Sequence, residues 1–185
     1  MCRMTRALLI IDIQRDYFPG GAHPLVGPED AAVNAAQVLA SFRAAGEPVV
    51  HVQHAWDAPD AAYLQPGTPG FEIHEAVRPA ADEPVVRKAE PNAFVGTGLE
   101  ARLRGLEVDE LVVAGMMSSM CVDATVRAAV DLGFAATVVH DACAAPDLEF
   151  GGETIPGRSV HGAFMAALGD GYATLISADD VSTAG

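Results

Sequence analysis

Three residues of this chain have side chains that together could hydrolyse a carbonyl compound. Asp12, Lys88 and Cys121 each follow closely on an apolar, strand-like run of residues. A carboxylate can take up and return a proton, an ammonium group can stabilise a thiolate, and a thiolate can attack a carbonyl carbon. The three residue types therefore indicate a cysteine nucleophile with a base and an electrostatic helper, provided that the fold brings them together.

Each of the three residues also has a plain structural interpretation. Asp12 could cap a helix or anchor a loop, Lys88 could be a solvated surface group, and Cys121 could be a small buried hydrophobe. Lys88 is, however, the one lysine beside ten arginines. A lone lysine indicates a position where the bulk and permanent charge of arginine would fail. Cys121 lies near the first turn of a predicted helix, and both that helix terminus and a neighbouring lysine would lower its thiol pKa.

Strand-like and helix-like segments alternate from one end of the chain to the other. The apolar runs that predict strands are Ala7–Ile13, Pro48–Val52, Pro84–Arg87, Glu110–Met116, Ala135–His140 and Ala173–Ser177. One predicted helix begins near Pro28 and ends near Gly46, and further helical patterns cover Thr97–Arg104, Cys121–Leu132 and Gly157–Leu168. This order predicts an α/β fold, with an open, mostly parallel sheet and helices on both faces. Ligands bind such sheets beyond the carboxyl ends of the strands, where the three candidate residues stand.

Length, charge and cysteine content exclude several classes of protein. A chain of 185 residues suits a single domain over residues 1–185. The net charge of −14 argues against nucleic acid, whose binding needs a basic surface. The first apolar run is too short for a membrane span or a secretory signal. Three cysteines without a CxxC pair indicate a reducing compartment, so we expect a cytoplasmic protein with no membrane attachment.

A series of motifs connects the three candidate residues. They are the run from Leu9 to Phe18, Lys88 followed by Asn92-Ala93-Phe94 and Thr97-Gly98-Leu99, the run from Gly115 to Val122, and Asp141-Ala142. In this order the motifs resemble the isochorismatase-like cysteine hydrolase superfamily, which includes nicotinamidases, N-carbamoylsarcosine amidohydrolases and ureidoacrylate amidohydrolases. The resemblance implies a three-layer αβα fold around a six-stranded, mostly parallel, Rossmann-like sheet. It also implies that Asp12, Lys88 and Cys121 form a catalytic triad.

The same resemblance implies how the reaction would proceed. It implies a cis peptide bond between Met116 and Met117, and an oxyanion hole formed by the backbone N–H groups of Met117 and Cys121. True isochorismatases cleave a vinyl ether and lack the nucleophilic cysteine, so Cys121 favours hydrolysis of a C–N bond through a thioester. In this scheme Asp12 takes the thiol proton and Lys88 stabilises the thiolate.

Four residues are candidates for contact with the substrate: Gln14, Phe18, Trp56 and Phe94. Phe18 and Phe94 resemble pocket positions of the family, and Gln14 belongs to the first motif. Trp56 lies with Tyr63 in the long loop after the second predicted strand. Both residues could line the substrate pocket or a subunit contact, and the sequence leaves these two alternatives open.

No metal ion and no other cofactor is expected. Nicotinamidases bind a metal through an Asp-x-His pair after the second strand, and Gln53 and Ala55 take those two places in this chain. His51 and His54 are three residues apart on or near a strand, which points their side chains to opposite faces. His161, on a late predicted helix, is expected to be a buried and hydrogen-bonded histidine rather than a catalyst.

These inferences favour a cysteine-dependent amidohydrolase that acts on a small amide, carbamoyl, ureido or lactam substrate. A streptothricin-type lactam hydrolase is a narrower alternative, and a non-catalytic binding or assembly module is an alternative of a different class. Cys143 is expected to be a packed residue rather than a second nucleophile. We expect a small-molecule substrate and a homo-oligomer, dimeric or tetrameric. Long loops are predicted at Phe18–Pro28, Ala58–Gly70 and Asp147–Gly157, and specificity would come from the loops Phe18–Pro28 and Ala55–Phe71.

Overall fold

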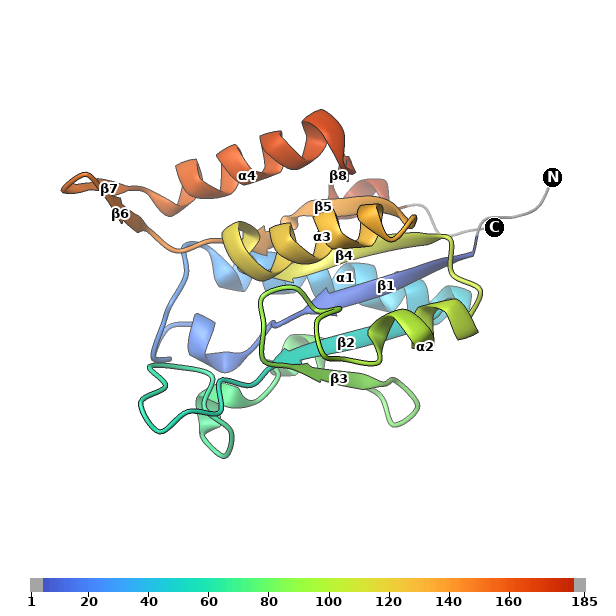
Figure 1. The fold of residues 1–185 in the computed structure, drawn as a ribbon, viewed down its shortest axis with the longest axis horizontal. Coiled ribbons are helices and arrows are strands. Elements are labelled where there is room, and N and C mark those ends of the chain that lie inside the picture. Colours follow the sequence, from blue (N-terminus) through green and yellow to red (C-terminus); the bar gives the residue numbers. More distant parts are fainter. Residues whose placement is uncertain (1–4, 182–185) are drawn as a thin grey trace.

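A six-stranded parallel sheet forms the centre of the computed structural model, which describes residues 5–181 (Figure 1). The order of the strands across the sheet is β3-β2-β1-β4-β5-β8. Their bounds are β1 Arg6–Ile11, β2 Val49–His54, β3 Val85–Lys88, β4 Glu110–Met116, β5 Ala135–Ala144 and β8 Thr174–Ile176. The carboxyl ends of the strands point toward the left of Figure 1, where the long loops gather. The predicted α/β sheet is thereby confirmed.

Helices cover both faces of this sheet and complete three layers. Helix α1 (Pro28–Ala45) packs on one face, whereas α2 (Leu99–Gly105), α3 (Asp123–Asp131) and α4 (Gly157–Gly171) pack on the other (Figure 1). Shorter helical turns are η1 Arg15–Tyr17, η2 Pro69–Phe71, η3 Glu75–Val77, η4 Ser118–Val122 and η5 Ala178–Asp180. None of the helices in the described part of the chain is long and apolar enough to cross a membrane.

The alternation of side chains along β1 explains the two hydrophobic cores. Leu8 and Ile10 join the core beneath α1, whereas Leu9 and Ile11 join the core beneath α2, α3 and α4. Successive residues of a strand point to opposite faces, so a continuous apolar run serves a sheet that is covered on both sides. Complete burial of each such side chain stabilises the fold by roughly 1.5–3 kcal/mol.

Several boundaries differ from the sequence prediction, among them the end of β5 at Ala144 rather than His140 and the start of α3 at Asp123 rather than Cys121. The first strand ends at Ile11 rather than Ile13, because Asp12 has a φ of 50° and leaves the strand conformation. The predicted loop Asp147–Gly157 contains an antiparallel hairpin, β6 (Leu148–Phe150) and β7 (Glu153–Ile155). Both residues of its Gly151-Gly152 turn have positive φ angles, which is the geometry that closes a two-residue hairpin. The hairpin projects from the body of the protein (Figure 1).

Candidate active site

Asp12 is held just beyond β1 in an unusual backbone conformation. Its φ of 50° lies in the left-handed region, which aspartate tolerates better than most residues. The N–H of Asp12 donates to the carbonyl oxygen of Val52 at 3.0 Å, and its own carbonyl accepts from the N–H of Gln14 at 2.9 Å. Gly115 of β4 lies against β1 so closely that a Cβ there would collide with the carbonyl oxygen of Ile11. Close packing of β1, β2 and β4 therefore fixes the place of the carboxylate.

The other two candidate residues reach the same edge of the sheet on different elements. Lys88 is the last residue of β3. Cys121 lies in the π-helical turn η4, which follows β4 and leads directly into α3. The peptide bond between Met116 and Met117, at the start of this connection, is cis. The carboxyl ends of β1, β3 and β4 thus deliver a carboxylate, an ammonium group and a thiol to one place.

The ammonium group of Lys88 lies at the centre of this cluster. Its Nζ atom is 2.7 Å from Oδ2 of Asp12, 3.1 Å from Sγ of Cys121 and 2.7 Å from Nδ1 of His54. The side chains of Asp12 and Lys88 are completely buried, and Cys121 is 3% exposed. The structure therefore brings the three predicted residues together and adds a histidine to them.

Burial shifts the proton equilibria of all three groups. Burial raises the pKa of the Asp12 carboxyl, and the nearby ammonium opposes this shift only in part. Burial lowers the pKa of Lys88, but the negative charges of Asp12 and Cys121 outweigh it and hold that pKa above its ordinary value. For Cys121, burial and the Asp12 carboxylate raise the pKa to about 12, although Lys88 opposes them.

Lys88 lowers the thiol pKa of Cys121, as expected, but burial and the Asp12 carboxylate outweigh this effect, so the pKa rises rather than falls. The prediction counted the charge of Lys88 but could not include the loss of water around Cys121, which favours the neutral thiol. The raised pKa favours the protonated form of the sulfur. A reaction that starts from Cys121 consequently needs a base close by, and a carboxylate oxygen of Asp12 lies within 4.8 Å of Sγ.

His54 is the residue of this cluster that the sequence analysis did not assign to it. The sequence indicates His54 only as a possible metal ligand on the face opposite His51, and the two side chains do have different surroundings. His51 is buried and bonds Glu83 at 2.9 Å, whereas His54 contacts Lys88. His54 pairs in register with Lys88 across β2 and β3. If the order of the strands had been known, this register would have predicted that His54 lies beside Lys88.

The side chain of Gln14 is completely buried. Its side-chain amide donates to the carbonyl oxygens of His54 and Phe71, at 3.0 and 2.8 Å, and its side-chain oxygen accepts from the N–H of His54 at 2.9 Å. Because these bonds occupy the amide, Gln14 ties the start of the first loop to the end of β2. The structure shows this supporting role for Gln14, and a contact of Gln14 with the substrate stays a prediction.

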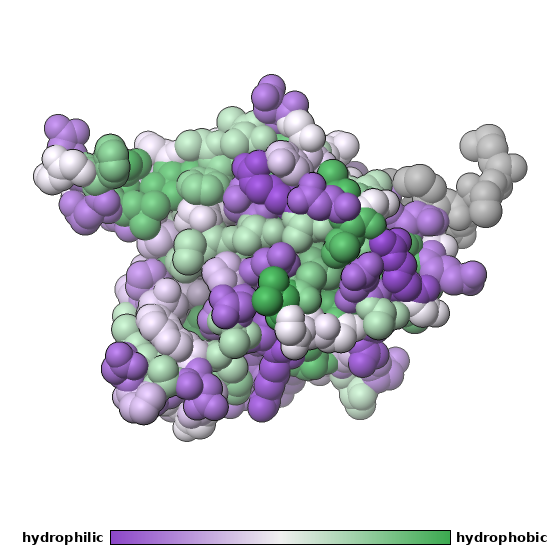
Figure 2. Space-filling view, in the orientation of Figure 1, coloured by the Kyte–Doolittle hydropathy of each residue, from purple (hydrophilic) through white to green (hydrophobic). Residues whose placement is uncertain are grey.

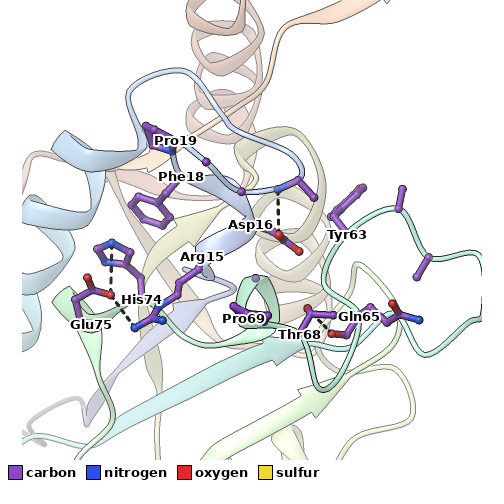
Figure 3. A pocket seen from close by; sticks show the side chains of 16 residues that line it. Arg15, Asp16, Phe18, Pro19, Tyr63, Gln65, Thr68, Pro69, His74 and Glu75 are labelled. Atoms are coloured by element: carbon purple, nitrogen blue, oxygen red, sulfur yellow. Dashed lines mark hydrogen bonds and ion pairs between the residues drawn. The ribbon is translucent and has the colours of Figure 1, made fainter.

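A cleft of about 810 Å³ opens among the loops beyond the strand ends. Phe18 and His74, whose rings stack at 3.9 Å, stand on one side of it, and Tyr63 stands on the other (Figure 3). Asp16 lies between them and accepts hydrogen bonds from two backbone N–H groups, those of Ala22 and Leu64. Asp16 thus joins the two loops that form the walls of the cleft.

The cleft and the buried cluster are neighbours that Tyr63 connects. Tyr63 lines the cleft, and after the effect of burial the charge of Cys121 is what raises the pKa of its hydroxyl. Trp56 is 40% exposed and packs edge-on against Tyr63 at 5.3 Å, so this pair belongs to one loop surface. Phe94 stacks on Phe134 at 6.2 Å and packs against the core that contains Cys121, away from Phe18.

The turn that carries Cys121 is anchored to α4. The hydroxyl of Ser118, which is completely buried, lies 2.8 Å from Nδ1 of His161. Burial lowers the pKa of His161, and nearby His140 lowers it further. His161 is therefore a half-buried, hydrogen-bonded histidine, as its sequence context predicted.

The cluster has the donor atoms of a metal site but does not fit a resident metal ion. Ligand atoms of Asp12, His54 and Cys121 lie within 4.8 Å of one another. The ammonium group of Lys88, however, is within 3.1 Å of an atom of each of them and supplies the positive charge there. Gln53, at an expected ligand place, instead donates its amide to the carbonyl oxygen of Phe71. A metal ion would have to displace the charged lysine.

An open parallel sheet that gathers a thiol, a carboxylate and an ammonium group beyond its carboxyl ends has the architecture of a small α/β enzyme. Comparison with known families gives a particular assignment. The isochorismatase domain matches residues 6–155, so the chain belongs to the isochorismatase family and is a hydrolase of that family.

Individual relatives agree with this assignment. The chain is 52% identical to the uncharacterized isochorismatase family protein YddQ of Bacillus subtilis, over 93% of this chain and 96% of that protein. It is 42% identical to a streptothricin hydrolase of Streptomyces noursei, over 90% of this chain but 60% of that protein. The crystal structure of an isochorismatase from Pseudomonas putida superimposes with a TM-score of 0.91 at 34% identity, covering 96% of this chain and 90% of that one.

Matches at lower identity include the family members named by the sequence resemblance. They are a ureidoacrylate amidohydrolase of Variovorax paradoxus at 27%, the nicotinamidase of Escherichia coli at 29%, and an N-carbamoylsarcosine amidase of Thermoplasma acidophilum at 26%. The resemblance drawn from the motifs is therefore confirmed at the level of the family.

Proposed function

We propose that this protein is a cysteine amidohydrolase, which hydrolyses a C–N bond of a small amide, carbamoyl, ureido or lactam compound. The observation that carries the proposal is the position of the Lys88 ammonium, 2.7 Å from Asp12 and 3.1 Å from the sulfur of Cys121. A nucleophile, a base and a stabilising cation are the minimum that such a reaction needs. Completely buried charges at a strand edge are costly unless they have a function of this kind.

In the first half of the proposed reaction, the substrate acylates Cys121. Asp12 takes the thiol proton, and the thiolate, stabilised by Lys88, attacks the carbonyl carbon. The backbone N–H groups of Met117 and Cys121 hold the negative oxygen of the tetrahedral intermediate. When this intermediate collapses, the C–N bond breaks, the nitrogen takes the proton from Asp12, and ammonia or an amine leaves. The acyl group stays on Cys121 as a thioester.

In the second half, water releases the acyl group. Asp12, which has given its proton to the leaving nitrogen, accepts a proton from water as the oxygen attacks the thioester. The second tetrahedral intermediate expels the thiolate of Cys121, which regains a proton, and the free acid departs. A raised pKa suits Asp12 to this work, because a carboxyl group that titrates closer to neutral pH both accepts and donates protons readily.

The cleft beside Tyr63 is the proposed entrance for the substrate. Phe18 supplies an apolar wall of the cleft, in keeping with the family resemblance of its motif. Asp16 and Glu75 make part of the lining of the cleft acidic. The 42% identity to a streptothricin hydrolase favours a lactam ring as one substrate to test. Trp56 and Phe94 lie outside the residues that line this cleft, and their contact with the substrate stays a proposal.

A panel of small compounds would test the proposal directly. Purified protein is incubated with primary amides, N-carbamoyl and ureido compounds, and lactams including streptothricin, and released ammonia or new amine and acid groups are measured. Mass spectrometry of the intact protein after brief acid quenching should reveal a thioester on Cys121. The matched control is Cys121→Ala, which should release nothing and carry no adduct. Turnover by this variant would exclude the thioester route.

The non-catalytic alternative predicts a different result from the same experiment. A binding or assembly module would neither release product nor become acylated with any member of the panel, yet would change its melting temperature with a ligand. The burial of three mutually paired ionisable groups favours the enzyme, because a binding module has no need of a thiol beside a base.

We further propose that the protein acts in the cytoplasm as a homo-oligomer. The free thiols of Cys121 and Cys143 suit a reducing compartment. The projecting β6–β7 hairpin carries exposed apolar residues among acidic ones (Figure 2), namely Leu148, Ile155 and Phe150, of which Phe150 is 78% exposed. Exposed apolar surface of this kind is typical of a contact between subunits. Light scattering should give a mass above that of one chain, and Phe150→Ser should lower it.

A further inference from the structure

The backbone of His54 is fixed on both sides by hydrogen bonds. Its N–H donates to the side-chain oxygen of Gln14 at 2.9 Å, and its carbonyl oxygen accepts from the side-chain nitrogen of Gln14 at 3.0 Å. The next residue, Ala55, donates its N–H to the carbonyl oxygen of Lys88 at 2.8 Å. The imidazole therefore starts from a backbone position that cannot easily move relative to Lys88.

The imidazole completes the set of acceptors around the ammonium group. An ammonium group has three N–H donors. Asp12 Oδ2 and His54 Nδ1, each 2.7 Å from Nζ, and Cys121 Sγ at 3.1 Å are three acceptor atoms for those donors. If one acceptor were absent, the ammonium could rotate or draw in water, and its two remaining contacts would lose their alignment.

The protonation state of His54 fits this role. A nitrogen that faces an ammonium group must accept, so the ring proton is on Nε2 and the imidazole is neutral. Burial, and then the positive charge of Lys88, lower the pKa of His54 to about 4. The Nδ1 acceptor is thus available throughout the neutral range. His51 lies on the same strand as His54, but its imidazole faces the carboxylate of Glu83 instead of an ammonium group.

We propose that His54 is a positioning residue, which holds the Lys88 ammonium in line with both Asp12 and Cys121 by accepting one of its three hydrogen bonds. The inference rests on the proposed function for its importance in turnover, but it makes a claim about the cluster itself. Without this acceptor, Lys88 stabilises the thiolate of Cys121 less well. The reactivity of the sulfur should then fall even when no substrate is present.

The charged and titratable groups around the sulfur are few. Asp12 and Lys88 adjoin it, Nδ1 of His54 lies 4.0 Å from it, and the phenolic groups of Tyr17 and Tyr63 are coupled to it electrostatically from the loop side. Both tyrosines have raised pKa values, which burial causes first, so they stay neutral near pH 8. A change in the reactivity of Cys121 at that pH can therefore be assigned to the group around Lys88.

The test measures alkylation of Cys121 by iodoacetamide as a function of pH, with the modified peptide quantified by mass spectrometry. Four proteins are compared: the wild type, His54→Ala, His54→Asn and His51→Asn. In His54→Asn the side-chain oxygen can replace Nδ1 as the acceptor. His51→Asn changes the same kind of residue on the same strand, away from Lys88. Circular dichroism establishes that each variant is folded.

We expect His54→Ala to be alkylated about tenfold more slowly at pH 8, with its rate profile shifted to higher pH. That is the effect of losing one hydrogen bond to a charged group. His54→Asn and His51→Asn should react within about threefold of the wild type, a factor within which most substitutions away from such bonds fall. An unchanged or faster rate in His54→Ala would overturn the proposal. Equal slowing in His54→Ala and His54→Asn would also overturn it, because the acceptor would then not be the cause.

This experiment needs no substrate, so its failure is distinct from failure of the proposed function. If the panel of amides yields a substrate, the same variants provide a second readout. Loss of positioning should lower kcat for His54→Ala while KM changes little, and His54→Asn should restore kcat. A rise in KM alone would show that His54 binds substrate instead and would contradict the positioning role.

Discussion

Cys121 and Cys143 are two buried thiols with different surroundings. They pack in the same hydrophobic core, are 3% and 6% exposed, and burial raises the pKa of each to about 12. Around Cys121 are the polar atoms of Asp12, Lys88 and His54. Cys143 instead donates to the carbonyl oxygen of Val139 at 3.4 Å. Burial and acidity alone therefore do not separate a nucleophile from a packing residue. What separates the two thiols is whether neighbouring groups can accept the proton of the thiol and stabilise the charge of the thiolate.

The positions of the two cysteines on the sheet explain this difference. Cys143 belongs to β5 and pairs with Gly115 of β4, after an irregularity in the register between these strands. Its side chain is confined between strands and helices. Cys121 lies beyond the end of β4, in the turn that begins α3. Only a residue past the strand ends can meet groups carried by β1, β2 and β3.

The first prediction compares the two cysteines through turnover. Cys121→Ala should abolish hydrolysis, with a loss of at least about 1,000-fold, since covalent catalysis has no substitute in the site. Cys143→Ala should retain turnover and lose roughly 1 kcal/mol of stability through the small cavity. Steady-state rates on any substrate from the panel, with urea unfolding of both variants, measure these effects. Equal losses of activity would remove the distinction between the two thiols.

The second prediction concerns the base that only Cys121 has. Asp12→Asn should lower kcat by about 100- to 10,000-fold, because an amide cannot take the thiol proton. The matched control is Asp180→Asn, which removes a carboxylate that bonds Ser177 far along the chain. This control should keep its turnover. Rates and thioester formation are measured together, and acylation of Asp12→Asn at the wild-type rate would show that another group is the base.

The third prediction tests the ion pair through stability. Lys88→Met leaves the buried Asp12 carboxylate without its cation, which typically costs about 3–5 kcal/mol in the free energy of unfolding. Arg87→Met, one residue earlier, removes an exposed guanidinium that lies over the ring of Phe71, and should cost about 1 kcal/mol or less. Urea unfolding at pH 7 gives both values. A similar, small cost in the two variants would mean that Lys88 is not paired in solution.

The sequence was informative where chemistry depends on strand ends, and less so where it depends on side-chain surroundings. Asp12 and Lys88 could be placed together because apolar runs mark the strands, and parallel strands end at one edge. The contact of His54 with Lys88 depends on β2 and β3 being neighbours. The raised pKa of Cys121 depends on burial by segments distant in sequence. Spacing along the chain could not provide either fact.

The role of Gln14 shows the same limit at the scale of one side chain. Its motif identified it as important, and a motif does not distinguish a residue that touches the substrate from one that supports the site. In the structure, three hydrogen bonds tie its amide to backbone groups of His54 and Phe71, which the motif alone does not show. The contact with Phe71 depends on the path of the loop after β2. This loop contains little regular structure, so its path cannot be predicted from the pattern of strands and helices.

The smallest predicted effect is the pH dependence of stability that comes from the imidazole beside Cys121, which Cys143 lacks. The folded-state pKa of His54 is lowered to about 4, from about 6.5 in the unfolded chain. As pH falls below 6.5, the unfolded chain takes up a proton that the folded protein refuses until about pH 4. The free energy of unfolding should therefore decrease as the pH falls from 6.5 to 4. The slope that His54 contributes is at most that of one proton taken up on unfolding.

His54→Asn removes the contribution of the imidazole to this pH dependence and keeps an acceptor for Lys88. The free energy of unfolding of this variant should therefore decrease less steeply over the same range. His51, whose pKa burial also lowers, and Asp12, whose pKa burial raises, contribute to both proteins alike. Urea unfolding at half-unit steps from pH 4 to pH 7.5 measures the difference between the two curves. Parallel curves would mean that His54 titrates normally when folded, which is incompatible with an imidazole held against the ammonium of Lys88.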